Sequence, residues 1–116
     1  MIVGITILTT LVFFSDILFG TSFFWDDITQ YVYPMASYAA KLSSQGITPF
    51  WNPYMFNGMP FLADFQAQYF YPAHWIFPLF IDPATGLLQP KIIEYVIILH
   101  FVIAQLSMIY LMRGLG

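Results

Sequence analysis

The chain has 116 residues, of which 59% are hydrophobic and 8% are charged, whereas about a quarter of the residues in a soluble domain are charged. Its net charge of -3, with only three Lys and Arg residues, argues against a nucleic-acid partner, because too few cations are present to neutralise a phosphate backbone. The absence of cysteine excludes disulfides and thiolate metal sites. We therefore expect a membrane protein, and the aromatic content of 21% predicts that much of it lies at the membrane–water boundary.

Residues 1–22 are predicted to form a first transmembrane helix. The run from Ile2 to Gly20 is almost wholly apolar and is close to the roughly 20 residues that span a bilayer. A cleaved signal peptide is the rival interpretation, but no Lys or Arg precedes the run and no small-x-small cleavage site follows it. We expect Asp16 to have a partner or to lie near the surface, because a carboxylate inside a membrane costs about 2.5 to 3.5 kcal/mol.

Residues 23–90 are predicted to form a long extracytoplasmic loop. Asp26 and Asp27 begin a helix-compatible stretch that ends at Gly46, and an acidic residue is a good N-cap. Pro34 falls inside this stretch, so a kink or a break into two short helices is expected there. The residues that follow, ITPFWNPYMFNGMP, contain three prolines and an Asn-Gly pair, which predicts successive turns.

The last part of the loop is predicted to lie on the membrane surface. From Phe61 to Phe70, aromatic residues recur at four-residue spacing while Asp64 and Gln68 share another face, which is typical of a short amphipathic interfacial helix. Prolines recur through residues 72–90 and limit any helix there to a few turns.

Residues 91–113 are predicted to form a second transmembrane helix, which Arg113 closes. The positive-inside tendency places Arg113 and the amino terminus in the cytoplasm and the acidic loop outside. In such a hairpin, Asp16 and His100 each lie about 13 Å below the outer boundary, at about 1.5 Å per residue. We expect them to pair, because an intramembrane charge usually faces a partner. The alternative is that both face helices outside this chain.

Asp26 and Asp27 are the best candidates for chemistry. A carboxylate that is open to water on one side and bordered by apolar groups can act as a general base or hold a divalent metal ion. Gln30 would share a helical face with Asp27 and orient a hydroxyl substrate. The simpler interpretation is that the two acids only cap the helix. Asp64 and Gln68 are a second candidate for substrate binding, and the simpler interpretation of this pair is a solvated face.

The aromatic residues of the loop suit either of two roles. They can stack on sugar faces or on an isoprenoid chain, or they can form an interface belt, and composition favours the belt. His74 has no companion His or Cys at metal-binding spacing and is interpreted as an interfacial residue. The aromatic residues concerned are Trp51, Tyr54, Phe56, Phe61, Tyr69, Tyr71 and Trp75.

A set of spaced residues runs through the loop in a recognisable order. It comprises Asp27-x-x-Gln30-x-x-Tyr33-Pro34, then Gly46-x-x-Pro49-x-Trp51-Asn52-Pro53, then Gly58-x-Pro60, Ala63 and Tyr71-Pro72. In this order the chain resembles the amino-terminal region of the bacterial YfhO-like membrane proteins, which are similar to GT-C type glycosyltransferases. The resemblance covers nearly the whole chain.

The resemblance implies a multi-pass protein of the bacterial cytoplasmic (inner) membrane that transfers a sugar, with inversion, from a polyprenyl-phosphate donor to an outer-surface glycan or polymer acceptor. Asp27 matches the loop acid of the family, which serves as base or metal ligand, and Asp26 is its neighbour. Gln30, Trp51 and Asn52 match further pattern positions and are candidates for substrate binding. Such proteins have many more than two spans. We therefore expect an amino-terminal fragment with an all-α membrane fold, in which two transmembrane helices are joined by a long outer loop with short interfacial helices.

Two other functions stay open. The chain is alternatively a non-catalytic small membrane protein whose aromatic loop docks a partner or membrane lipid. It is also compatible with a segment of a transporter or flippase, in which Asp16 and His100 would matter more than the acids of the loop.

Overall fold

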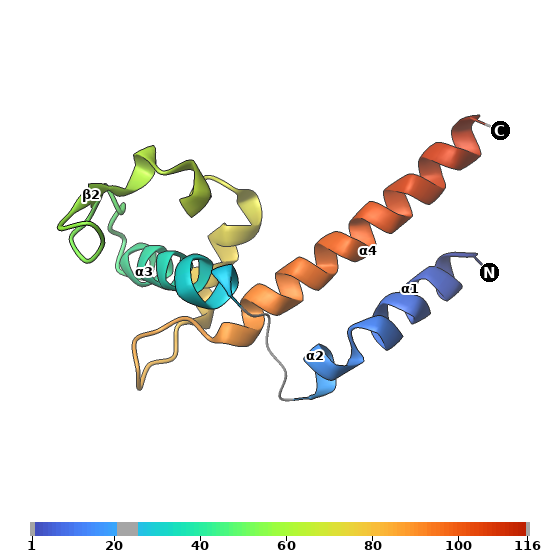
Figure 1. Cartoon of the computed structure of the whole chain (residues 1–116), viewed down its shortest axis with the longest axis horizontal. Coiled ribbons are helices and arrows are strands. Elements are labelled where there is room, and N and C mark those ends of the chain that lie inside the picture. The colour runs from blue at the N-terminus through green and yellow to red at the C-terminus, as the bar shows by residue number, and fades with distance from the viewer. Residues whose placement is uncertain (1, 21–25, 116) are drawn as a thin grey trace. The chain divides into compact units, whose positions relative to one another are not determined.

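The computed structural model describes residues 2–20 and 26–115, and these residues are mostly helical (Figure 1). The chain divides into two compact units. The helical unit comprises Met1–Phe24 and Ile93–Gly116, and the loop unit comprises Trp25–Ile92. The predicted division into two transmembrane helices and an extracytoplasmic loop, with boundaries at residues 22 and 91, stays a prediction.

The second apolar run forms one long helix, as predicted. Helix α4 spans Pro90–Leu115, a length of 26 residues, with Arg113 in its last turn. At about 1.5 Å per residue it is long enough to cross the roughly 30 Å hydrocarbon core of a bilayer. Among the described residues, it is the one helix both long and apolar enough to do so.

The first apolar run is interrupted, and the prediction of one membrane-length helix over residues 1–22 is not supported. Helix α1 (Ile2–Phe13) ends before Phe14, and a separate short helix α2 (Ser15–Phe19) follows. Next to this break the hydroxyl of Ser15 donates to the backbone oxygen of Val12 at 2.8 Å. Twelve residues of α-helix reach only about 18 Å, well short of a membrane core. Residues 21 and 22 of the predicted span lie outside the described residues.

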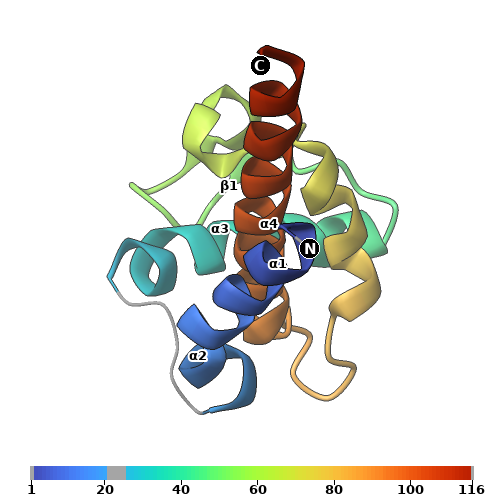
Figure 2. The same ribbon diagram turned by 90° about the vertical axis from the view of Figure 1, so that its right-hand side faces the viewer.

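Helices α1 and α4 run side by side within the helical unit (Figure 1; Figure 2). Thr10, which is buried, donates from Oγ1 to Oε1 of Gln105 at 2.7 Å, and the rings of Phe14 and Phe101 lie 5.1 Å apart. No sequence pattern predicted this polar link between the helices. The expected pairing of Asp16 with His100 stays a prediction: Asp16 is exposed, and His100 Nδ1 lies 2.6 Å from the backbone oxygen of Val96.

The loop unit begins with a continuous helical stretch. A π-helical segment, η1 (Ile28–Val32), runs directly into α3 (Tyr33–Ser44). The helix type changes one residue before Pro34, which occupies the first turn of α3, where a missing backbone N–H costs nothing. The interruption predicted at Pro34 is thus a change from π to α geometry. Helix α3 ends just before Gly46, as predicted, and Gly46 takes a positive φ of 73°.

A small β-hairpin follows, where only turns were predicted. Strands β1 (Trp51–Asn52) and β2 (Met59–Pro60) pair antiparallel, with Trp51 opposite Pro60 and Asn52 opposite Met59. The expectation of a wholly α-helical fold is therefore wrong at this place. Gly58 closes the hairpin with a φ of 109°, and a Cβ there would lie 2.7 Å from the Trp51 ring. This position accepts glycine because the backbone is left-handed and the indole lies against it.

The amphipathic helix predicted from Phe61 to Phe70 is also wrong. Two 3-10 turns, η2 (Phe61–Ala63) and η3 (Phe65–Ala67), replace it. Asp64 separates them with extended backbone, and its Oδ1 accepts from the backbone N–H of Gln66 at 2.9 Å. Aspartate favours such local bonds over a continued helix, and this preference outweighs the apolar spacing.

The proline-rich part of the loop unit packs against α3. The 3-10 helix η4 (Pro72–Phe80) has no more than a few turns, as predicted, and lies beside α3 (Figure 2). A turn then brings Ile81 opposite Leu88. Helix α3 holds Leu88 from both sides: the Ser37 hydroxyl accepts from its N–H at 3.0 Å, and the Tyr33 hydroxyl donates to its carbonyl at 2.8 Å.

The core of the loop unit is built around Phe61. Its side chain is 0% exposed and packs with Met35 and Ala39 of α3 and with Ala67. The rings of Tyr38 and Tyr69 lie 5.5 and 6.4 Å from the ring of Phe61. Because this core joins α3 to segments more than twenty residues later, it fixes the positions of the loop residues around the helix.

Candidate functional site

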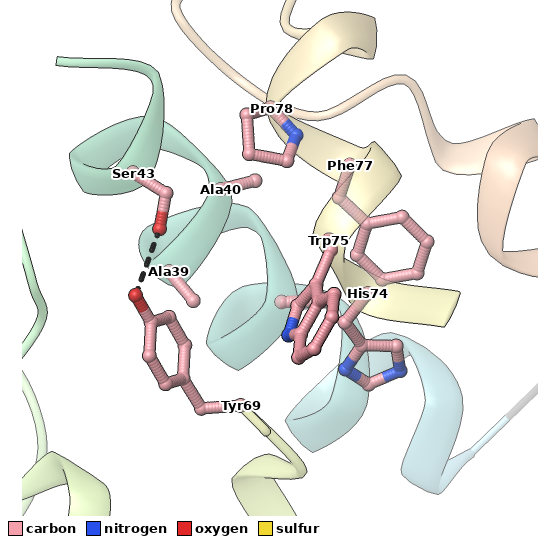
Figure 3. Close-up of a pocket in the computed structure, with 9 residues that line it drawn as sticks. Ala39, Ala40, Ser43, Tyr69, His74, Trp75, Phe77 and Pro78 are labelled. Atoms are coloured by element: carbon pink, nitrogen blue, oxygen red, sulfur yellow. Dashed lines mark hydrogen bonds between the residues drawn. The ribbon is translucent and has the colours of Figure 1, made fainter. Parts of the chain in front are cut away.

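Two cavities of the loop unit border α3. The larger has a volume of about 410 Å³ and is lined in part by the side chain of Lys41, so we call it the Lys41 cavity. The smaller has a volume of about 300 Å³, and we call it the Trp75 cavity (Figure 3). The Lys41 cavity is lined by Tyr33, Pro34, Ser37, Tyr38, Lys41, Leu42, Asn52, Tyr54, Met55 and Leu87. The Trp75 cavity is lined by Ala36, Ala39, Ala40, Ser43, Tyr69, His74, Trp75, Phe77 and Pro78.

The Lys41 cavity combines tyrosine rings with one positive charge. The hydroxyl of Tyr38 donates to the backbone oxygen of Trp51 at 2.6 Å, and the Tyr54 ring stands edge-on to the Tyr38 ring at 5.9 Å. Burial, and next the neighbouring Tyr54, raises the pKa of Tyr38, so this hydroxyl stays neutral. Lys41 is exposed, and its ammonium group has no ion pair or hydrogen bond with the residues that the structure describes. The cavity can therefore offer its cation to an anionic ligand.

The Trp75 cavity has small side chains from α3 on one side and rings from η4 on the other (Figure 3). At one end the hydroxyls of Ser43 and Tyr69 lie 3.4 Å apart. At the other end the imidazole of His74 stacks on the Phe77 ring, with centroids 4.6 Å apart and planes 25° apart. The lining includes four side chains with hydrogen-bonding groups and none with a full charge of Asp, Glu, Lys or Arg.

The predicted catalytic acids lie at the start of the helical stretch and are exposed. Asp27 occupies the N-cap position of η1 but makes no side-chain cap bond, so the capping expected of its carboxylate is wrong. Instead, the backbone oxygen of Asp26 accepts from the N–H groups of Thr29 and Gln30, both at 2.9 Å. Asp26 reaches this geometry with a positive φ of 61°. Asp26, Asp27 and Gln30 line neither cavity.

Among the described residues, a metal site at these acids finds no third His, Asp or Glu side chain. No group of three or more His, Asp or Glu side chains there is close enough together to hold a metal ion. A divalent ion at Asp26 and Asp27 would therefore need to complete its coordination with other ligands, since carboxylate sites for Mg²⁺ or Ca²⁺ use about six or more oxygens.

Asn52 and Trp51, the predicted substrate-binding residues of the hairpin, have different surroundings. The Asn52 side chain is buried, and both of its polar atoms are occupied: Nδ2 donates to Sδ of Met35 at 3.5 Å, and Oδ1 accepts from the N–H of Tyr54 at 2.9 Å. Asn52 thus holds the hairpin on α3 and lines the Lys41 cavity from there. The Trp51 side chain is half exposed and covers Gly58.

Asp64 and Gln68 do not share a helical face. Gln68 is exposed and has a left-handed backbone with a φ of 50°. Asp64 is half-buried, and its Oδ2 accepts a hydrogen bond from the Tyr31 hydroxyl. Asp64 therefore ties the end of η1 to the turns that surround the core. Of the polar residues predicted for the site, Asn52 lines the Lys41 cavity in the described structure, and the candidate stacking residues Tyr54, Tyr69 and Trp75 each line one of the two cavities.

The hydrogen bond between Tyr31 and Asp64 predicts a pH dependence. Burial, then the bond to Asp64 and its negative charge, raises the pKa of Tyr31 from its ordinary value of 10.0 to about 12. Because the unfolded chain loses this proton first, the stabilising effect is complete below about pH 10 and is lost as the pH rises towards 12. The difference between the absorbance titrations of the parent protein and Tyr31→Phe isolates the phenolate of Tyr31. We expect this difference to have its midpoint near pH 12, and we expect Asp64→Asn to lower the midpoint. A midpoint near 10 in the parent protein would contradict the prediction.

Several cavity residues were not recognised as a site in the sequence. Ser43 and Tyr69 are 26 residues apart, and Lys41 and Leu87 are on different segments, so no local spacing pattern links them. The one available signal was that Lys41 is the only cation between the first acids and Lys91.

No protein-family model, curated protein or solved structure matches this chain. The resemblance to the YfhO-like proteins thus rests on the spaced residues of the loop, and it stays a prediction.

Proposed function

We propose that this chain is the amino-terminal part of a membrane glycosyltransferase-like protein of the YfhO-like family. It would act in the bacterial cytoplasmic membrane, taking a sugar from a polyprenyl-phosphate carrier and passing it to an acceptor on the outer surface. The observation that carries the proposal is the Lys41 cavity, which joins a cation without a described partner to the rings of Tyr33, Tyr38 and Tyr54. A glycosyl phosphate presents the matching features, because its phosphate is anionic and its sugar ring has an apolar face.

In the proposed reaction Asp27 takes the proton of the acceptor hydroxyl. The hydroxyl oxygen forms a bond to the anomeric carbon, the bond from this carbon to the phosphate oxygen breaks, and the polyprenyl phosphate leaves with the electron pair. Lys41 would balance the charge of the departing phosphate. Asp27 and Lys41 are fourteen residues apart on one helical stretch, or about 20 Å.

Replacing Lys41 by Gln tests this role of the cavity. We expect the KM for the donor to rise about tenfold, with a smaller effect on kcat, because a charge-assisted bond to phosphate is worth about 1.5 kcal/mol or more. The measurement uses the full-length protein in liposomes, with labelled polyprenyl-phosphate glucose, galactose and mannose as donors. The matched control is Lys91→Gln, since Lys91 lines neither cavity. Equal KM values for the two variants would remove Lys41 from donor binding.

The non-catalytic docking function is the second candidate, and the hairpin favours it. The side chains of Tyr54 and Phe56, both in the turn between β1 and β2, are 83% and 80% exposed. Large aromatic side chains gathered on one exposed turn are typical of a surface that binds a protein partner or membrane lipid. The docking function requires no role for Asp27, whereas the transfer reaction does. The effect of replacing Asp27 therefore distinguishes the two functions.

A further inference from the structure

We propose that the Trp75 cavity is a binding site for one neutral pyranose ring. It is a different site from the Lys41 cavity, because α3 contributes different residues to each. The Trp75 cavity is lined by Ala36, Ala39, Ala40 and Ser43 of this helix, and the Lys41 cavity by Tyr33, Pro34, Ser37, Tyr38, Lys41 and Leu42. The site does not require the transfer reaction proposed above.

The polar groups of the cavity have capacity left for a ligand. The hydroxyls of Ser43 and Tyr69 lie 3.4 Å apart, longer than the usual 2.5 to 3.0 Å between two oxygens, so their mutual bond is weak. Each hydroxyl can donate once and accept at least once more. The indole N–H of Trp75 makes no hydrogen bond to any residue that the structure describes. Three groups are therefore available to the hydroxyls of a sugar.

The rings supply the apolar surface that a sugar face requires. Figure 3 shows the indole of Trp75 between Tyr69 and His74, and its side chain is 66% exposed. The stacking of His74 on the buried Phe77 fixes the neighbouring ring. Across from these rings, Ala39 and Ala40 have only methyl side chains, so the space between α3 and η4 stays open.

Other ligand classes fit this cavity less well. No Lys or Arg lines it, so an anion finds no counter-charge, and His74 is its one metal-binding side chain. A hydrocarbon chain would leave the Ser43 and Tyr69 hydroxyls without partners when it displaced water from them, at an energetic cost. The volume of about 300 Å³ lies at the lower end of the range for small-ligand sites, which suits a single ring.

The test measures binding of simple glycosides to the full-length protein in nanodiscs. The probes are methyl β-D-glucopyranoside, methyl β-D-galactopyranoside and methyl α-D-mannopyranoside. Binding is followed by saturation-transfer NMR and by the Trp75 fluorescence, which is the part of the tryptophan signal that is lost in Trp75→Phe. We expect at least one probe to bind saturably, with a Kd of about 1 mM. Tyr69→Phe should raise this Kd about fivefold, because it removes one hydroxyl and keeps the ring.

The matched control is Tyr110→Phe, the same change at an exposed tyrosine of α4 that lines neither cavity, and it should leave the Kd unchanged. Asp27→Asn should also bind the glycoside normally, so loss of transfer and loss of binding are separate results. Absence of saturable binding for all three probes would overturn the proposal. It would equally be overturned if 1-octanol displaced the glycoside and altered the Trp75 fluorescence in the same way, because the cavity would then take a hydrocarbon chain.

Discussion

Replacing Asp27 by Asn should lower sugar transfer by about 10² to 10⁴-fold in the full-length protein, the usual contribution of a positioned general base. Asparagine has almost the same shape as aspartate but cannot take up the proton of the acceptor hydroxyl. The carboxylate is exposed and makes no cap bond, so the fold of the loop unit does not depend on it. The expression level of the variant should therefore equal that of the parent. Transfer is measured with labelled polyprenyl-phosphate sugars in liposomes.

Asp26→Asn is the matched control, because it makes the same change at the adjacent exposed acid. Asparagine tolerates the positive φ of this position, so the backbone bonds from Thr29 and Gln30 to residue 26 are kept. Transfer should fall much less than in Asp27→Asn. If Asp27→Asn transferred sugar as well as the parent protein, Asp27 would have no part in the reaction, and the docking function would become the better account of the loop unit.

The parts of the fold that depend on a single segment could be predicted from the sequence. The signals were a long apolar run and a glycine that ends a helix. The apolar run of residues 91–113 is long enough that almost any packing leaves it helical, and α4 was found there. The end of α3 next to Gly46 was also foreseen, since a glycine can take the left-handed backbone that follows a helix. Both features follow from local physical preferences.

The failures come from single side chains and from distant contacts. The apolarity of residues 1–22 contains no sign of the break between Phe13 and Ser15. The aromatic spacing after Phe61 was outweighed by one bond from Asp64 to the next turn. The candidate sites show the same limit: the exposure of Asp26 and Asp27 was anticipated from their position, whereas both cavities join α3 to residues well separated from it in the chain.

Replacing Phe61 by Ala should destabilise the loop unit by about 3 to 5 kcal/mol, the usual cost of removing a buried phenyl ring. The ring is fully buried among Met35, Ala39 and Ala67, and it contacts the rings of Tyr38 and Tyr69. Since domains are stable by only about 5 to 15 kcal/mol, a large part of the stability of the unit would be lost. Denaturant unfolding in detergent measures this, with the tryptophan fluorescence of the loop unit as the signal.

Phe65→Ala provides the control, because its ring is 87% exposed although it lies only four residues further along the chain. Its effect should stay within about 0.5 kcal/mol, as for most exposed positions. Equal destabilisation by the two variants would contradict the placement of Phe61 in the core. Tyr38 lines the Lys41 cavity and Tyr69 lines the Trp75 cavity, and both rings pack on Phe61. We therefore expect both cavities to depend on this core. Ligand binding at either cavity should then weaken in Phe61→Ala and stay unchanged in Phe65→Ala.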